Sequence, residues 1–169
     1  PRRQPWLAWG GAIAAAIALV GGWAIVNRGA SDIIVTAPGE HRTIALADGS
    51  RIVMNGGTRI AYDADQPRFA RLEKGEALFE IRHDEARPFV VMAGETRLVD
   101  AGTVFNVVND KHVLEVEVAE GAVIYEGERN PIRLNPGDAL VRLGPATARA
   151  RVSKANIAAV GSWREGVLQ

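Results

Sequence analysis

The sequence contains no cysteine, which excludes disulfide bonds and metal sites built from thiolates. Histidine is also scarce: His41, His83 and His112 stand beside charged or polar residues and show no paired spacing. A metal site needs at least three converging nitrogen or oxygen ligands. We therefore expect the three histidines to be solvated, and no metal or cofactor to be bound.

The net charge is zero, but the charges are unevenly distributed. The 20 basic residues include three arginines within residues 1–28, where no acidic residue occurs, so 17 basic residues remain against 20 acidic ones beyond that point. Nucleic-acid binding requires a basic surface. This balance argues against nucleic acid as a partner.

One long hydrophobic run, from Pro5 to Val26, contains no charged residue. As a helix it would measure about 33 Å, enough to cross the roughly 30 Å hydrocarbon core of a bilayer. Tryptophans lie near both of its ends, where amphipathic rings favour the headgroup level. The run predicts a single transmembrane helix at residues 5–26.

The arginines around this run predict its orientation. Arg2 and Arg3 precede it and only Arg28 follows closely, so the positive-inside rule places residues 1–4 in the cytoplasm and exports the rest. A cleaved secretory signal is the alternative, but signal peptides have a shorter apolar run of about 7–15 residues and a small-residue cleavage site. Because the chain begins at Pro1 and not at methionine, we expect a cytoplasmic portion to be missing from it.

After a predicted linker at 27–36, the sequence is typical of an all-β domain at 37–143. Short runs rich in Val, Ile, Thr and Phe recur about every 8–12 residues between glycine-bearing turns. Within Val113–Val118, the aliphatic residues from Leu114 onward alternate strictly with glutamate, as in a sheet with one buried and one solvated face. Both a β-sandwich and a short β-solenoid fit this pattern.

Three further segments predict local structure within this domain. Ala77–Ile81 is expected to be a strand with Phe79 inward and Glu80 outward. Thr43–Asn55 predicts a hairpin, because an Asp-Gly pair at its centre tolerates the positive φ angles of a tight turn. Arg87–Val91 is expected to begin a strand at its proline. We expect eight residues to shape the domain: Gly49, Gly75, Phe79, Phe89, Gly102, Phe105, Gly121 and Gly137.

The remaining residues, 144–169, read as a linker and the start of another unit. Arg149–Ser162 is rich in alanine and predicts a short helix or a linker. Ser162–Leu168 is interpreted as the first strand of a lobe that the chain does not complete. Within it, Trp163 has two open interpretations: a side chain that caps the β core, or a docking residue.

Several short segments follow one another in a characteristic order. They are Gly39-Glu40, Leu46–Ser50, Gly75–Ile81, Arg87–Val91, Ala101–Val107, Val116–Gly121 and Leu134–Asp138. In this order, behind a single predicted anchor, the sequence resembles the FecR family, inner-membrane regulators of extracytoplasmic-function sigma factors in cell-surface signalling. Trp163–Leu168 is similar to the W-x-x-G-x-L segment that leads such proteins into their C-terminal lobe.

The resemblance implies a regulatory protein and not an enzyme. Proteins of this family have a cytoplasmic domain that binds the sigma factor, one inner-membrane helix, and a periplasmic part. That part senses the signalling domain of a TonB-dependent outer-membrane receptor, usually one that serves iron-siderophore uptake. By this resemblance, we expect the sigma-binding domain and most of the C-terminal lobe to be missing from this chain.

The resemblance also implies one chemical site. In several such proteins the bond matching Gly102–Thr103 is cut by self-cleavage, in which the threonine hydroxyl attacks the preceding carbonyl and water opens the resulting ester. Such a reaction needs a permissive residue before the nucleophile and a nearby base. Asp100 is the nearest candidate base in the sequence. The alternative is a purely structural role without cleavage, in which Gly102 forms a bend and Thr103 enters the next strand.

Two other functions remain as alternatives. Pro136-Gly137-Asp138 is similar to a turn of cupin-type β-barrel enzymes, but no histidine follows in residues 138–144 to hold a metal. A membrane-tethered domain that binds a cell-envelope polymer would be expected to expose aromatic residues, and only one tryptophan lies outside the predicted anchor.

Overall fold

The computed structural model describes residues 32–100, 102–127 and 129–165. The predicted cytoplasmic end at 1–4 and the predicted transmembrane helix at 5–26 lie outside these residues. Among the described residues, no helix combines the length and the apolar character that a membrane span needs.

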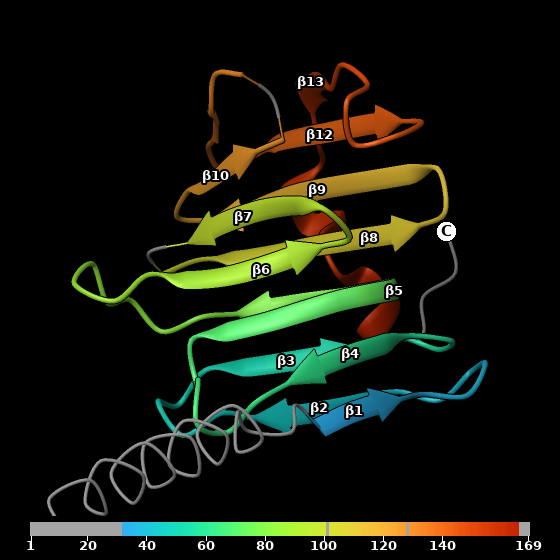
Figure 1. Cartoon of the computed structure of the whole chain (residues 1–169), viewed down its shortest axis with the longest axis vertical. Coiled ribbons are helices and arrows are strands. Elements are labelled where there is room, and N and C mark those ends of the chain that lie inside the picture. Colours follow the sequence, from blue (N-terminus) through green and yellow to red (C-terminus); the bar gives the residue numbers. More distant parts are fainter. Residues whose placement is uncertain (1–31, 101, 128, 166–169) are drawn as a thin grey trace, which may run out of the picture. The chain divides into compact units, whose positions relative to one another are not determined.

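The described residues form thirteen strands and two short 3-10 helices (Figure 1). The strands are β1 (Asp32–Val35), β2 (Arg42–Ala45), β3 (Arg51–Met54), β4 (Arg59–Tyr62), β5 (Phe69–Glu80), β6 (Phe89–Ala93), β7 (Thr96–Asp100), β8 (Val104–Asp110), β9 (Val113–Glu120), β10 (Val123–Glu126), β11 (Ile132–Leu134), β12 (Asp138–Leu143) and β13 (Arg151–Lys154). The helices are η1 (Ile157–Ala159) and η2 (Ser162–Glu165). The prediction of an all-β domain is confirmed.

All thirteen strands belong to one sheet, which curls into two layers that face each other (Figure 1). The first layer contains β1, β4, the first half of β5, β6, β7, β10 and β11. The second layer contains β2, β3, the second half of β5, β8, β9, β12 and β13. After β5, successive hairpins alternate between the layers. The domain therefore combines the facing layers of a sandwich with the stepwise progress of a solenoid.

The long strand β5 joins the two layers. Its first half pairs with β4 and, in parallel, with β6, whereas its second half pairs with β3 and β8. The change of partners falls at Gly75, which has a φ of +97°. A Cβ there would lie only 2.5 Å from the hydroxyl oxygen of Thr58, the residue before β4, so a larger residue does not fit at this point.

The hydrophobic core lies between the layers. Phe79 of β5 stacks on Phe105 of β8 with ring centroids 5.1 Å apart. Across the interior, Phe79 also contacts Phe89 of β6 at 6.4 Å. All three rings are fully buried, as expected for residues that shape the domain.

The predicted strands with local sequence signals are confirmed. In β9, Leu114, Val116 and Val118 are fully buried, while the glutamates between them are partly exposed. The predicted hairpin is formed by β2 and β3, with Gly49 at a φ of +87° in its turn. The strand predicted to begin at Pro88 is β6, which starts at the next residue, Phe89.

The ends of the β domain differ from the prediction. β1 lies within the predicted linker at 27–36 and pairs with β4. At the other end, Arg149–Ser162 contains a strand, β13, which extends the second layer beside β12 where a helix or linker was predicted. The interpretation of Ser162–Leu168 as a strand is wrong for Ser162–Glu165, which form a 3-10 helix. In both places, tertiary pairing and packing override the local composition.

Residues 156–165, called the C-terminal strap below, run over the outer face of the second layer. η1 contacts β9, and Gly161 is packed so closely that a Cβ on it would lie 2.9 Å from Cδ1 of Leu78 in β5. Because Leu78 alternates with the inward-facing Phe79, it points away from the core. It is nevertheless fully buried, since the strap covers it.

Polar contacts also hold the strap. Nε1 of Trp163 donates a hydrogen bond to Oδ1 of Asn106 in β8 at 3.3 Å, and its ring packs edge-on against His41 at 5.3 Å. Nη1 of Arg164 lies 2.7 Å from Oε1 of Glu80. Trp163 therefore docks on the outside of a layer and does not cap the core.

Candidate functional site

The turn between β7 and β8 brings together three of the residues singled out from the sequence. Oδ1 of Asp100 accepts hydrogen bonds from the Gly102 N–H at 2.9 Å and from the Thr103 hydroxyl at 2.5 Å. Gly102 has a φ of +134°, a conformation that side chains rarely adopt. The candidate base thus lies against the candidate nucleophile, because a short turn forces their side chains together.

Close packing fixes the backbone of this turn. A Cβ on Gly102 would lie 2.4 Å from Cα of His83, and a Cβ on Gly121 would lie 2.4 Å from the Gly102 carbonyl oxygen. The Ile81 N–H donates to the Thr103 carbonyl at 2.9 Å. The bond between Gly102 and Thr103 is therefore held from both sides by neighbouring backbone.

The Asp100 carboxyl is fully buried. Burial raises the pKa of Asp100 above its ordinary value, and the hydrogen bonds from Thr103 and Gly102 oppose this shift only in part. Its second oxygen, Oδ2, has no hydrogen-bond partner among the described residues. A carboxylate with a raised pKa is a stronger base than an ordinary one, so it is better suited to accept the proton of a hydroxyl.

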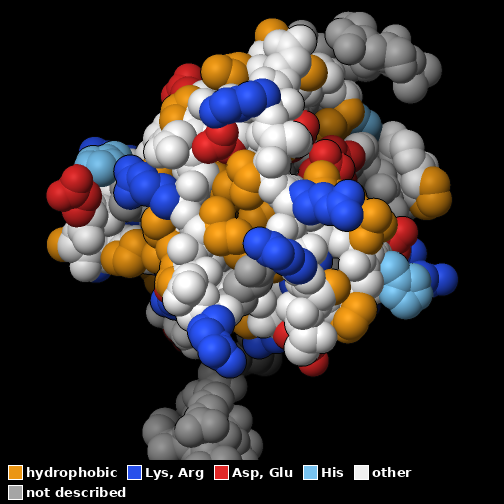
Figure 2. All heavy atoms as spheres, turned by 90° about the horizontal axis from the view of Figure 1, so that it is seen from above, with side chains coloured by type: hydrophobic (Ala, Val, Ile, Leu, Met, Phe, Trp, Pro, Cys, Tyr) orange, Lys and Arg blue, Asp and Glu red, His pale blue; other side chains and the backbone are white. Residues whose placement is uncertain are grey.

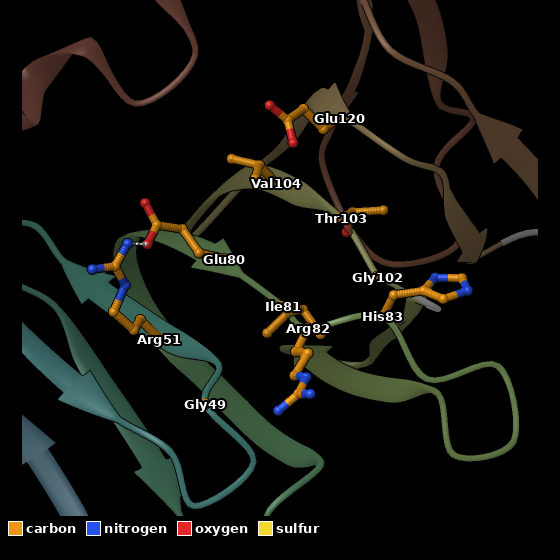
Figure 3. Close-up of a pocket in the computed structure, with 10 residues that line it drawn as sticks. All are labelled: Gly49, Arg51, Glu80, Ile81, Arg82, His83, Gly102, Thr103, Val104 and Glu120. Carbon is orange, nitrogen blue, oxygen red and sulfur yellow. Dashed lines mark ion pairs between the residues drawn. The ribbon is translucent and has the colours of Figure 1, made fainter.

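An open cavity of about 490 Å³ lies beside the turn (Figure 3). Its wall includes Gly102, Thr103 and His83, and, farther along, the ion pair between Glu80 and Arg51 at 2.6 Å. Because Glu80 also binds Arg164, its carboxylate links this cavity to the C-terminal strap. Sequence reasoning missed this link, since Arg164 lies 84 residues away from Glu80 and no local pattern marks it.

The geometry of the turn allows two roles. The hydrogen bonds of Asp100 satisfy a buried hydroxyl and an N–H group, which stabilises the turn. The same contacts place the Asp100 carboxylate within reach of the Thr103 hydroxyl. This hydroxyl lies next to the Gly102–Thr103 amide bond, which is the bond that self-cleavage would cut. The first role is served whether or not the amide bond is cut.

The other polar residues considered from the sequence do not gather at one place. His41, His83 and His112 are all exposed, and the ring of His41 also contacts the ring of Trp163. Asp138 forms an ion pair with Lys154 at 2.5 Å. Within residues 32–100, 102–127 and 129–165, no three His, Asp or Glu side chains are placed to hold a metal ion.

Solved structures with the same architecture define the class of domain. Two crystal structures of a candidate anti-sigma factor from Parabacteroides distasonis match with TM-scores of 0.72 and 0.70, at 26% and 25% sequence identity. Each match covers 80% of this chain and 65% of the other. The present chain thus spans less than two thirds of the length of these relatives. No curated protein matches the sequence.

The family model of the FecR protein matches residues 32–124. This range begins at β1 and ends within β10, so it contains the crossing strand β5 and the Asp100–Thr103 turn. The chain belongs to the FecR family. The resemblance deduced from the ordered sequence segments is confirmed.

Proposed function

We propose that this chain is the sensing part of a regulator of an extracytoplasmic-function sigma factor. In this proposal, residues 5–26 cross the inner membrane once, residues 1–4 lie in the cytoplasm, and the β domain lies in the periplasm. The sigma factor is bound by a cytoplasmic domain outside residues 1–169. The observation that carries the proposal is the FecR match together with the likeness to a candidate anti-sigma factor.

The proposed signal is contact with the periplasmic signalling domain of a TonB-dependent receptor for iron-siderophore uptake. The layered β domain is suited to protein recognition, since it offers unpaired strand edges at β1, β2, β11 and β13 within its described part. Binding of the receptor's signalling domain would change the conformation or the position of the β domain, and the membrane helix would transmit this change to the sigma factor.

A pull-down tests this partnership. The whole chain, immobilised in detergent, is incubated with purified signalling domains of TonB-dependent receptors from the same organism. We expect one domain, or a small related set, to be retained at stoichiometric levels. If a folded chain retains none of them, the receptor link is wrong.

The Asp100–Thr103 contact favours self-cleavage as a second activity. The Thr103 hydroxyl oxygen would attack the Gly102 carbonyl carbon while its proton passes to Asp100. The Gly102–Thr103 amide bond then breaks, the Thr103 nitrogen takes up a proton, and an ester remains. Water hydrolyses this ester to a Gly102 carboxylate and restores the threonine hydroxyl.

Intact-mass measurement over time tests this chemistry. Fragments 1–102 and 103–169 should accumulate in the wild type, more slowly in Asp100→Asn, and not in Thr103→Ala. Thr103→Ser, which keeps a hydroxyl, should still be cleaved. The rate should rise with pH through the raised pKa of Asp100, because only its carboxylate accepts the proton. A wild type that stays intact while folded would leave Asp100 with its structural role alone.

A further inference from the structure

The end of the domain at β12 and β13 differs in charge from the rest. Residues 129–154 contain six basic residues and one acidic residue, whereas residues 32–126 contain ten basic and 17 acidic residues. The single acidic residue, Asp138, is already paired with Lys154. Figure 2, which looks onto this end, shows hydrophobic surface with lysine and arginine side chains on several sides of it.

Apolar and basic side chains line a cavity here. Val141 and Leu143 of β12 and Arg149 and Arg151 surround a space of about 310 Å³. Leu143 is 68% exposed. Neither arginine forms an ion pair with a carboxylate of the described residues, so both guanidinium groups are available to a partner.

The pairing of β12 and β13 places these groups on one face. Arg151 stands opposite Val141, so their side chains point to the same side of the sheet. Val152 of β13 stands opposite Leu140 and points to the other side. It is 48% exposed, although it is a valine in a strand.

The backbone of β13 presents an open edge. The Ala155 N–H donates to the Gly137 carbonyl at 2.9 Å, and on the far side of β12 the Gly144 N–H donates to the His112 carbonyl at 2.7 Å. Hydrogen bonds alternate along an antiparallel pair, so Arg151 and Ser153 bond β12. The N–H and carbonyl groups of Val152 and Lys154 therefore face away from β12, where β13 has no strand partner among the described residues.

From these features we infer that β13 binds an extended acidic segment of a partner protein, which adds a strand to the second layer. The segment's backbone bonds the free groups of Val152 and Lys154. Its acidic side chains alternate with apolar ones: the former meet Arg149 and Arg151, and the latter contact Val152. Positive charge beside an open strand edge selects such a strand over a neutral or basic one.

The inference rests on the proposed function in taking a protein as the partner, but it is tested separately. A fluorescein-labelled peptide that alternates glutamate with valine is titrated with the whole chain in detergent, and fluorescence anisotropy is measured. We expect saturable binding that is weaker at high salt. A peptide with lysine in place of glutamate should not bind.

Two variants and one peptide separate strand addition from simple charge attraction. Arg149→Glu together with Arg151→Glu should weaken binding at least about tenfold, because like charges then meet. Val152→Pro should also weaken it, since proline removes an outward N–H and spares the bonds to β12. A peptide of the same composition with its glutamates and valines in separate blocks should bind much more weakly than the alternating one.

The matched control is Arg71→Glu with Lys74→Glu, a reversal of two exposed basic residues on β5. It should leave peptide affinity unchanged, and circular dichroism should show that every variant is folded. Equal binding of the alternating and block peptides, or full affinity in the β13 variants, would overturn the inference. Either outcome concerns the β13 edge only, because the pull-down with receptor domains tests the proposed function independently.

Discussion

The two halves of β5 belong to the same strand but differ in what covers them. In the first half, buried Ala70 and Leu72 alternate with exposed Arg71, as in a sheet with one solvated face. In the second half, Leu78 is as fully buried as Phe79, although the two point to opposite sides. The difference arises from the C-terminal strap, which covers only the second layer.

The covered face is also polar in places, and its polar groups are connected. Asn106 accepts the hydrogen bond from Trp163 and donates to Glu76 at 2.8 Å, and Asn55 donates to the second oxygen of Glu76 at 2.6 Å. The strap is therefore held by a satisfied polar network as well as by apolar contact. Its attachment to the β domain is consequently specific, and it can be weakened by single substitutions.

The largest expected effect concerns the core side of β5. Phe79→Ala should lower the free energy of unfolding by about 3–5 kcal/mol, because it leaves a cavity between the two layers. Urea denaturation measures this change. Phe69→Ala, at the half-buried start of the same strand, is the control and should cost clearly less. Equal losses at the two positions would contradict the assignment of the core.

The next effect concerns the strap itself. Trp163→Ala should cost about 2 kcal/mol, less than a fully buried tryptophan would, because the ring is half-buried. Hydrogen exchange should accelerate at the amides of β5 near Leu78 and remain unchanged near Leu72. Trp163→Phe keeps the ring contact with His41 and should retain most of the protection. Faster exchange in both halves of β5 would show that the strap does not act locally.

A glycine pair isolates the contact between the strap and the sheet. Gly161 and Gly39 have φ angles of +66° and +78°, but a Cβ meets Leu78 only at Gly161 and meets nothing within 4 Å at Gly39. Alanine should cost about 1–2 kcal/mol at both positions through backbone strain. The extra loss at position 161, expected to be below about 1 kcal/mol, measures the packing on Leu78. Identical losses of stability for Gly161→Ala and Gly39→Ala in thermal unfolding would mean that the strap shifts to accommodate the added Cβ at no measurable cost.

The smallest effect depends on pH. Glu117 stands opposite Asn106 on the covered face, and burial, with the charges of Glu115 and Glu76, raises its pKa above the ordinary value. A carboxyl with a raised pKa in the folded state contributes most stability below its ordinary pKa, and this contribution is lost as the pH rises through the raised one. Glu117→Gln should therefore flatten the fall in stability over that range, as followed by denaturation at a series of pH values. Glu95→Gln, in an exposed turn, should not. Parallel profiles for wild type and Glu117→Gln would rule out this contribution.

The sequence predicted the features that depend on local signals, but it could not predict those that depend on contacts between distant segments, such as the burial of the second half of β5. Alternation predicted β9 and the Asp-Gly turn predicted the β2–β3 hairpin, because both signals are local. Asp100 could be named as the candidate base for Thr103 for the same reason, as only two residues separate them in the sequence. No local signal could reveal the burial of Leu78, since its cover lies about eighty residues later in the chain.

The C-terminal region shows why composition alone misled. Arg149–Ser162 is rich in alanine, which favours helix, but Arg151–Lys154 pairs with β12 and becomes an edge strand. The alternation of Arg149 and Arg151 with smaller residues was the available clue to a strand. This alternation is too short to outweigh the alanines, and pairing with β12 decides for the strand.

The proposed role of this chain is to sense a partner protein in the periplasm as part of a sigma-factor regulator. The most direct measurement is transcription from a promoter that depends on the cognate sigma factor, in cells that carry the complete protein or a version lacking residues 32–165. The account predicts that receptor stimulation changes reporter output in the first cells, and that this response is absent in the second. An unchanged response without residues 32–165 would contradict it.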